Sequence, residues 1–490
     1  MKELGKWQII SFISRGMAMA LGIVQSFVII RLLSVREWGL IQLAVSIGGA
    51  LGIYQHLGLA SASTREISGA KKNEDIFKIF VTSITIRYLI TFPIVLCLFF
   101  FADKIAVNLY KNPEIIFPLK LYAISLFFQG FQSILNSVIS GMKRFKQLFI
   151  YQVAISVVST LLYIPFVYFF KINGYFYAFL AFNVLNTLFL FFVALLPLRH
   201  EMHFPSRKDY KILFKDIFSI SIGIYIVKII YTNWEKLGGT LLGLHNTAEI
   251  VGIYAFAALF AKKILSISDA VTDVNLPVLS EKFMSDIDDF KHTFKRNFDK
   301  VYALILLSAA FAMYWSREII NLVVGSTKYD SSVPLIPVLV LAFVIYSVLN
   351  VVNSSVLIPV KMTKEMIGSF ALMLLASVFS FFGFSMRLDP VTSMAWAITV
   401  GAFICLLYML FTINKRIKFT FFTFDYYMLL LQLYFVGWAG NHASGLMKVA
   451  GFVPLYGLLL YALFVSKLVT KNEVISIKNK ILKKYGREQK

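Results

Sequence analysis

Long apolar runs separated by short polar breaks extend along nearly the whole chain. A helix that crosses the hydrocarbon core of a bilayer, about 30 Å thick, needs about 20 apolar residues. Windows of about 19 residues, cut at charged residues and at Pro or Gly clusters, predict about fourteen such helices. They lie near residues 7–33, 39–60, 77–102, 117–140, 147–170, 174–197, 212–233, 249–276, 298–324, 334–359, 362–387, 391–413, 424–441 and 446–469. Barrel strands would instead alternate in polarity over about ten residues, so the pattern predicts an all-α integral membrane protein.

The composition agrees with a chain that lies mostly in lipid. Of its 490 residues, 58% are hydrophobic and only 15% are charged, which exceeds what the surface of a soluble protein tolerates. The loops between the apolar runs are short, and none is long enough to fold as a catalytic domain. We therefore expect helices surrounded by membrane lipids and do not expect an enzyme.

The positions of the basic residues predict the orientation in the membrane. The formal net charge is +22, which would indicate a nucleic-acid partner if the charges formed one patch. Most Lys and Arg instead fall in alternate loops, on the side of the N-terminus, as the positive-inside rule requires of cytoplasmic loops. We expect a multi-pass protein with both termini in the cytoplasm and no nucleic-acid partner. The first run, residues 7–33, contains Arg15 and is too long for the core of a signal peptide, so we interpret it as a retained span.

Cysteine and histidine offer no metal site. Cys97 and Cys405 lie inside apolar runs, which argues against a disulfide or a metal thiolate. His56, His245 and His442 are isolated, lie at or near outer span ends and lack the spacing of metal ligands. We expect them to be interfacial polar residues rather than ligands or bases, and we expect no cofactor.

Two segments six spans apart share one design. Residues 31–47 lead through a polar turn into a helix that opens at Gly39, and residues 240–263 do the same at Gly252. An even number of spans per repeat predicts two parallel halves related by an axis along the membrane normal, with the substrate site between them. The predicted division is a first lobe of six spans (1–197), a second lobe of six spans (198–413), and two added spans with a basic tail (414–490).

The same segments carry a family resemblance. It rests on residues 31–47, 57–68, 141–152, 251–257 and 276–280. Over about the first 410 residues the chain resembles the polysaccharide-export branch of the multidrug/oligosaccharidyl-lipid/polysaccharide flippase superfamily, and within it the Wzx-type O-antigen repeat-unit transporters. Where relatives often place Asp before a basic residue after the seventh span, this chain has Glu235 and Lys236. That departure leaves the role of the acid open.

The resemblance implies a function. It implies a flippase that moves undecaprenyl-diphosphate-linked oligosaccharide from the cytoplasmic to the outer leaflet of a bacterial inner membrane. The lobes would rock to open the site to each side in turn. Protons or sodium ions are the candidate counter-ions, and polysaccharide-assembly proteins are candidate partners.

Cationic residues inside the spans are candidates for the binding site. A charge at mid-bilayer depth costs at least about 2.5 to 3.5 kcal/mol on insertion scales, so it is retained for a reason. Arginine and lysine donate charge-assisted hydrogen bonds to phosphate oxygens, and tyrosine stacks on sugars. The candidate substrate-binding residues are Arg15, Gln25, Arg87, Tyr225, Lys228 and Lys262.

The carboxylates near these spans are the candidates for ion coupling. They are Glu235, Asp269 and Asp273. A simpler interpretation stays open for some cations, because Arg15 could snorkel toward a span end and Lys262 could pair with Asp269 or Asp273 on its own helix.

Two other functions compete with the flippase. A drug/cation antiporter of the same fold would need a pocket lined by carboxylates, and the excess of Lys and Arg in the spans argues against it. A membrane glycosyltransferase or polymerase that acts on the same lipid-linked substrate would need a larger outer loop than this chain has.

Overall fold

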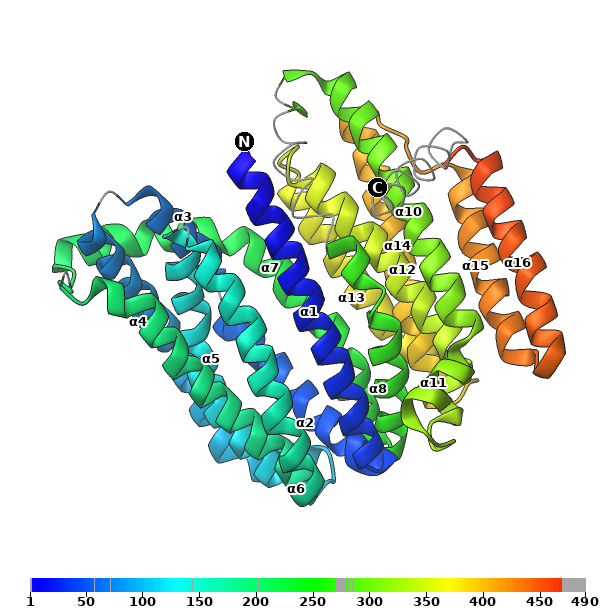
Figure 1. The fold of residues 1–490 in the computed structure, drawn as a ribbon, viewed down its shortest axis with the longest axis horizontal. Coiled ribbons are helices and arrows are strands. Elements are labelled where there is room, and N and C mark those ends of the chain that lie inside the picture. The colour runs from blue at the N-terminus through cyan, green and yellow to red at the C-terminus, as the bar shows by residue number, and fades with distance from the viewer. Residues whose placement is uncertain are drawn as a thin grey trace, which may run out of the picture. The chain divides into compact units, whose positions relative to one another are not determined.

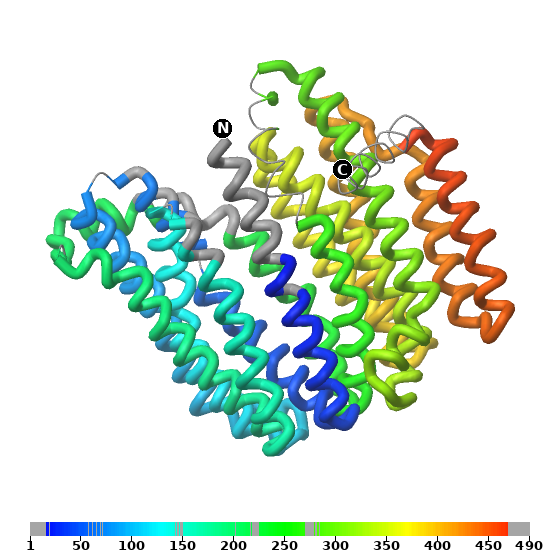
Figure 2. Tube along the Cα trace, in the orientation of Figure 1, coloured from blue at the N-terminus to red at the C-terminus, as the bar shows by residue number. Residues whose placement is uncertain are grey.

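The computed structural model describes residues 2–56, 58–70, 72–142, 144–200, 202–269, 279, 282–283 and 285–468 (Figure 2). Within its helices it does not describe the side chains of residues 2–15, 19, 61, 65, 69, 145–146, 148–149, 216 and 218–224. Contacts group the chain into two units. Unit 1 holds Met1–Ala255 and Val323–Lys328, and unit 2 holds Phe256–Leu322 and Tyr329–Lys490.

Unit 1 is a bundle of helices. Its elements are α1 (Lys2–Leu32), α2 (Val35–Gly52), η1 (Ile53–Gln55), α3 (Leu59–Gly69), α4 (Asn73–Lys104), η2 (Ile105–Leu109), η3 (Pro113–Ile115), α5 (Ile116–Gly141), α6 (Phe145–Leu195), η4 (Leu196–Leu198), α7 (Arg207–His245) and the start of α8 (Ala248–Lys262). In Figure 1, α4, α5 and α6 run side by side, and α1 and α5 both pack on α6. Lys171 has non-helical backbone angles (φ 52°, ψ −124°), so α6 is two helices that meet at this residue.

Unit 2 holds the rest of α8 and the C-terminal helices. They are α10 (Ile287–Tyr314), α11 (Ser316–Val324), η5 (Asp330–Leu335), α12 (Ile336–Val352), η6 (Asn353–Leu357), α13 (Thr363–Phe384), α14 (Pro390–Ile417), α15 (Phe424–His442) and α16 (Gly445–Val465). α12 forms the centre of this unit. It belongs to the apolar segment Asp330–Leu357, and 89% of the most apolar stretch of that segment is buried. α13 and α14 form a hairpin, and α15 and α16 form a second one that packs on α10 (Figure 1).

A short segment from the α11 end returns to unit 1. The Lys328 ammonium donates to the carbonyl oxygens of Ile30 at 2.8 Å and Leu33 at 2.6 Å. These carbonyls lie at the C-terminal end of α1, where a helix has unpaired acceptors and a negative dipole end. Lys328 therefore caps α1, which explains why Val323–Lys328 groups with unit 1.

The predicted spans can be compared with the observed helices. All elements in the described ranges are helical, and a helix lies at each predicted span, so the all-α prediction is confirmed. Eight helices in the described residues are long and apolar enough to cross a bilayer, or nine if α10 and α11, bent by 67°, form one span. The total of fourteen stays a prediction. The lobe boundaries also stay a prediction, because nothing in the two units tests a division by repeat.

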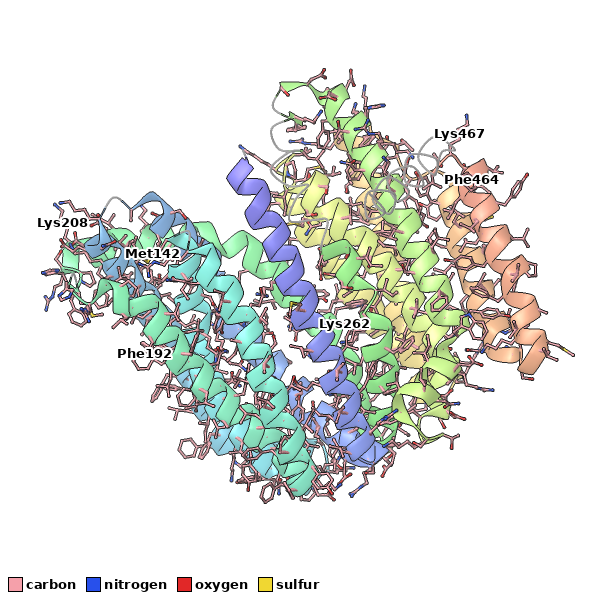
Figure 3. All side chains as sticks on the ribbon, viewed as in Figure 1. Met142, Phe192, Lys208, Lys262, Phe464 and Lys467 are labelled. Carbon is pink, nitrogen blue, oxygen red and sulfur yellow. The ribbon has the colours of Figure 1, made fainter. Side chains whose placement is uncertain are left out.

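Apolar side chains cover the outer surface of the helices. Figure 3 labels Phe192 of α6 and Phe464 of α16, whose side chains are 66% and 39% exposed. Phe169 and Phe379 are more than 70% exposed. Apolar exposure on this scale is unfavourable in water and favourable in lipid. With the apolar spans, it makes the chain a multi-pass membrane protein.

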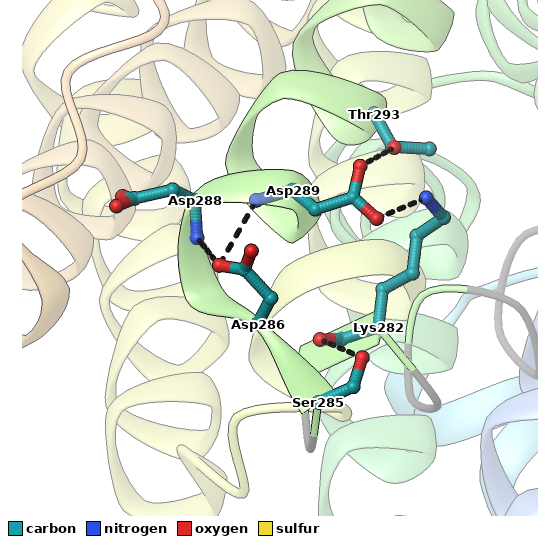
Figure 4. A network of polar contacts seen from close by, with 6 residues as sticks. All are labelled: Lys282, Ser285, Asp286, Asp288, Asp289 and Thr293. Carbon is teal, nitrogen blue, oxygen red and sulfur yellow. Dashed lines mark hydrogen bonds and ion pairs between the residues drawn. The ribbon is translucent and has the colours of Figure 1, made fainter.

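The acidic residues at the start of α10 serve as a helix cap. Asp286 accepts from the backbone N–H groups of Asp288 at 2.8 Å and Asp289 at 3.3 Å. The Asp289 carboxylate in turn accepts from the Lys282 ammonium and, at 3.2 Å, from the Thr293 hydroxyl (Figure 4). These contacts satisfy backbone donors that the first turn leaves free. No group of His, Cys, Asp and Glu in the described part of the chain is arranged to hold a metal.

Candidate functional site

The second predicted span, residues 39–60, is broken toward its C-terminal end. α2 ends at Gly52, a single 3-10 turn covers Ile53–Gln55, and α3 begins at Leu59 after Gly58, whose φ is +65°. A left-handed backbone favours glycine, and the joint interrupts the regular pairing of backbone carbonyls with N–H groups four residues on. The carbonyls of Ile53 and His56 still accept from the N–H groups of His56 at 3.0 Å and Leu59 at 3.1 Å. Inside a bilayer, donors from other helices add to such incomplete pairing. The sequence predicted one uninterrupted span over 39–60, so the break corrects that prediction.

Arg87 of α4 adds a side-chain donor to one carbonyl of the break. Its Nη1 donates to the carbonyl oxygen of His56 at 3.2 Å, and its Nη2 lies 3.2 Å from Nδ1 of the same residue. The side chain is 0% exposed. Its Nε is buried and has no hydrogen-bond partner among the residues that the structure describes.

Tyr225 of α7 and Thr91 of α4 complete the support of the break. The Tyr225 hydroxyl donates to the carbonyl oxygen of Tyr54 at 2.6 Å, and the Thr91 hydroxyl donates to Oε1 of Gln55 at 3.1 Å. Gln55 is 1% exposed and Tyr225 is 8% exposed. The break is therefore held from two sides, by α4 and by α7.

Lys228 places a second cation beside Arg87. It lies three residues after Tyr225 in α7, on the same face of the helix, and its side chain is exposed. The positive charges of Arg87 and Lys228 act on each other and on the His56 imidazole. No carboxylate in the described ranges forms an ion pair with Arg87 or Lys228. A buried cation without a counter-charge is unfavourable by several kcal/mol, so this arrangement favours an anion as its partner.

The other candidate binding residues lie elsewhere. Oε1 of Gln25 accepts from the hydroxyls of Ser159 at 3.0 Å and Thr160 at 3.4 Å, and so links α1 to α6. Lys262, labelled in Figure 3, is the last residue of α8 and belongs to unit 2. The side chain of Arg15 lies outside the described residues. The structure thus brings Arg87, Tyr225 and Lys228 together, while roles for Arg15, Gln25 and Lys262 stay predictions.

The candidate coupling carboxylates have different surroundings. Glu235 lies beside its neighbour Lys236, with 3.6 Å between Oε1 and Nζ. Asp269 in unit 2 accepts from the side-chain amide of Asn350 at 2.8 Å. Asp273 lies outside the described residues. Nothing in these contacts tests a role in ion coupling.

The sequence analysis did not anticipate the contact that His56 makes. His56 was expected at or near an outer span end, and that depth stays a prediction. The structure places it between α2 and α3, in contact with Arg87. A signal for it exists in the sequence. Gln55 and His56 are adjacent polar residues within an apolar span, followed by Gly58, which is the composition of a helix break.

Comparisons with known proteins give the family and the fold. A family model described as polysaccharide biosynthesis protein matches residues 28–334, which is more than half of the chain. Comparison with curated protein sequences gives no match.

Many solved structures share the fold, among them the following two. One is described as the inward-facing conformation of a multidrug resistance MATE family transporter of the MOP superfamily, with a TM-score of 0.70 and 14% identity over 84% of this chain and 98% of that chain. The other is described as the lipid II flippase MurJ in an inward closed conformation, with a TM-score of 0.71 and 16% identity over 94% of this chain and 100% of that chain. At such identities the similarity concerns the fold alone, and it confirms the predicted MATE-like fold.

Proposed function

The chain belongs to the polysaccharide biosynthesis protein family, and we therefore propose that it is a flippase for undecaprenyl-diphosphate-linked oligosaccharide repeat units. It acts in a bacterial inner membrane by alternating access, as a Wzx-type transporter with both termini in the cytoplasm. The observation that carries this proposal is the pair of neighbouring cations, Arg87 and Lys228, without a carboxylate partner in the described ranges.

A diphosphate is the part of such a substrate that resists crossing the membrane. Its oxygens lose their water when the headgroup enters the protein, and charge-assisted hydrogen bonds from arginine or lysine replace that hydration. Lys228 is exposed and contacts the headgroup first in this proposal. Arg87 is fully buried, so it reaches the phosphate only after the α2–α3 break rearranges. Binding would therefore be linked to a change in the second span, as alternating access requires.

The structural neighbours support this class of substrate. One of them, MurJ, is described as a lipid II flippase, and the match covers 94% of this chain. Another is described as a multidrug resistance MATE family transporter, so drug export by the same fold is the second candidate. A pocket for cationic drugs needs negatively charged side chains such as carboxylates, and the cations Arg87 and Lys228 would repel these drugs. A counter-ion, H⁺ or Na⁺, would use Glu235, Asp269 or Asp273.

Vesicles that contain the purified protein test the substrate class. The expected result is that a fluorescent undecaprenyl-diphosphate-linked oligosaccharide changes leaflet, whereas the cationic dye ethidium does not accumulate. Lys228→Glu should abolish movement of the lipid. Lys415→Glu, which reverses an exposed charge in the last turn of α14, serves as its matched control and should not. Ethidium transport without movement of the lipid-linked oligosaccharide would contradict the proposal and favour the antiporter.

A further inference from the structure

His56 holds the Arg87 guanidinium in place. Its carbonyl oxygen and its Nδ1 atom each lie 3.2 Å from a terminal nitrogen of Arg87. A guanidinium only donates hydrogen bonds, so Nδ1 must accept and must carry a lone pair. In this contact the imidazole is therefore neutral, with its proton on Nε2.

This contact keeps Arg87 away from any ligand. The guanidinium is 0% exposed, so a phosphate cannot reach it while His56 holds it. An imidazolium could not keep the contact, because its Nδ1–H would face the N–H groups of Arg87 donor to donor. When His56 is neutral, Arg87 therefore has two acceptors in the break, the carbonyl oxygen and Nδ1 of His56. When His56 is protonated, only the carbonyl oxygen remains.

We propose that His56 is the positioning residue that releases Arg87 to a phosphate group of the substrate when the imidazole takes up a proton. The inference rests on the function proposed above. The imidazole takes the proton from water at Nδ1, the hydrogen bond from Nη2 of Arg87 is lost, and the proton returns to water when the phosphate leaves. No other bond forms or breaks.

The groups around His56 link this proton to the anion. α4 presents Arg87, α7 presents Lys228 and Tyr225, and Tyr54 lies two residues before His56 on its own segment. The Tyr225 hydroxyl already donates to the Tyr54 carbonyl. A lone imidazolium would face two cations, and a phosphate between them removes that repulsion. By linkage, proton uptake and phosphate binding then favour each other equally.

The test compares the full chain with its His56→Asn variant in detergent, with inorganic pyrophosphate as the probe. The asparagine amide oxygen can accept from Arg87 as Nδ1 does, but it does not titrate near neutral pH. Calorimetry between about pH 5.5 and 8.5 gives the two affinities across the range in which histidine titrates. Their ratio cancels the titration of pyrophosphate itself. We expect the ratio of wild-type to variant affinity to rise as the pH falls, by up to about tenfold per unit for one linked proton.

Nitrogen NMR of labelled histidine measures the protonation state and the tautomer of His56 directly. The His56 signal is identified because it is missing from the spectrum of His56→Asn. We expect the Nε2–H tautomer without ligand and an imidazolium in the pyrophosphate complex. A pH-independent affinity ratio, or a ligand-free ring protonated on Nδ1, would overturn the inference and leave the proposed function standing. If neither protein binds pyrophosphate at any pH, the proposed function fails, and the inference fails with it.

Discussion

Gly39 of α2 and Gly252 of α8 lie against each other in unit 1. A Cβ atom on Gly39 would lie 1.7 Å from the Ala248 carbonyl oxygen and 2.9 Å from the Gly252 nitrogen. A Cβ atom on Gly252 would lie 2.3 Å from the Val35 carbonyl oxygen and 3.2 Å from the Gly39 nitrogen. These two glycines occupy matching positions in the two segments that the sequence analysis interpreted as a repeat, and that repeat stays a prediction. Their backbones are in direct contact, as small residues allow between membrane helices.

This contact predicts that alanine is not tolerated at either glycine. Gly39→Ala and Gly252→Ala each place a methyl group inside the backbone of the facing helix, so α2 and α8 must move apart. We expect a loss of about 1 to 3 kcal/mol, the usual effect of overpacking, measured as a lower midpoint of thermal unfolding. Gly383→Ala in α13, where nothing lies within 4 Å of the added atom, is the control. Equal midpoints for Gly39→Ala and Gly383→Ala would contradict the contact.

The C-terminal hairpin provides a second prediction. Lys448 of α16 is 2% exposed, its Nζ lies 2.6 Å from Oε2 of Glu318, and it lies 5.7 Å from the ring centres of Tyr314 and Trp315. Glu318→Gln leaves this buried cation without its counter-charge, whereas Lys448→Met removes the charge and keeps most of the volume. Loss of one partner is the more harmful change to a buried pair.

We therefore expect Glu318→Gln to lower the unfolding midpoint more than Lys448→Met does. The double variant should resemble Lys448→Met alone, because the glutamine no longer leaves a charge unpaired. If Lys448→Met is the more harmful of the two, the ion pair is not what fixes the hairpin.

Tyr225 gives a prediction about the helix break. Tyr225→Phe removes the side-chain donor to the Tyr54 carbonyl, and a buried acceptor that loses its partner costs about 1 to 3 kcal/mol. We expect lower stability and faster hydrogen exchange in Ile53–Gln55. Tyr408→Phe changes an exposed tyrosine of α14 and serves as the control. Unchanged exchange in Tyr225→Phe would show that the hydroxyl does not hold the break.

Hydropathy predicted the helices because long apolar segments must cross the bilayer as helices. It also placed the end of one span at residue 170, next to the break at Lys171. It missed the break after Gly52, because an averaging window registers polarity and not backbone geometry. Helical spacing placed Tyr225 and Lys228 on one face, and the structure agrees. The contact of Arg87 with His56 joins residues 31 positions apart. No local pattern specifies such a contact, so neither it nor the full burial of Arg87 could be predicted.

Transport by Lys228 variants tests the central claim that positive charge beside Arg87 shelters a phosphate-bearing headgroup. The measurement is the initial rate at which undecaprenyl-diphosphate-linked oligosaccharide changes leaflet in vesicles with equal amounts of protein. Lys228→Ala should lower the rate about tenfold or more, because it removes the free energy of one charge-assisted hydrogen bond. Lys228→Arg and the control Lys415→Ala should keep most of the wild-type rate. A Lys228→Ala protein that moves the lipid as fast as the wild type would contradict the account.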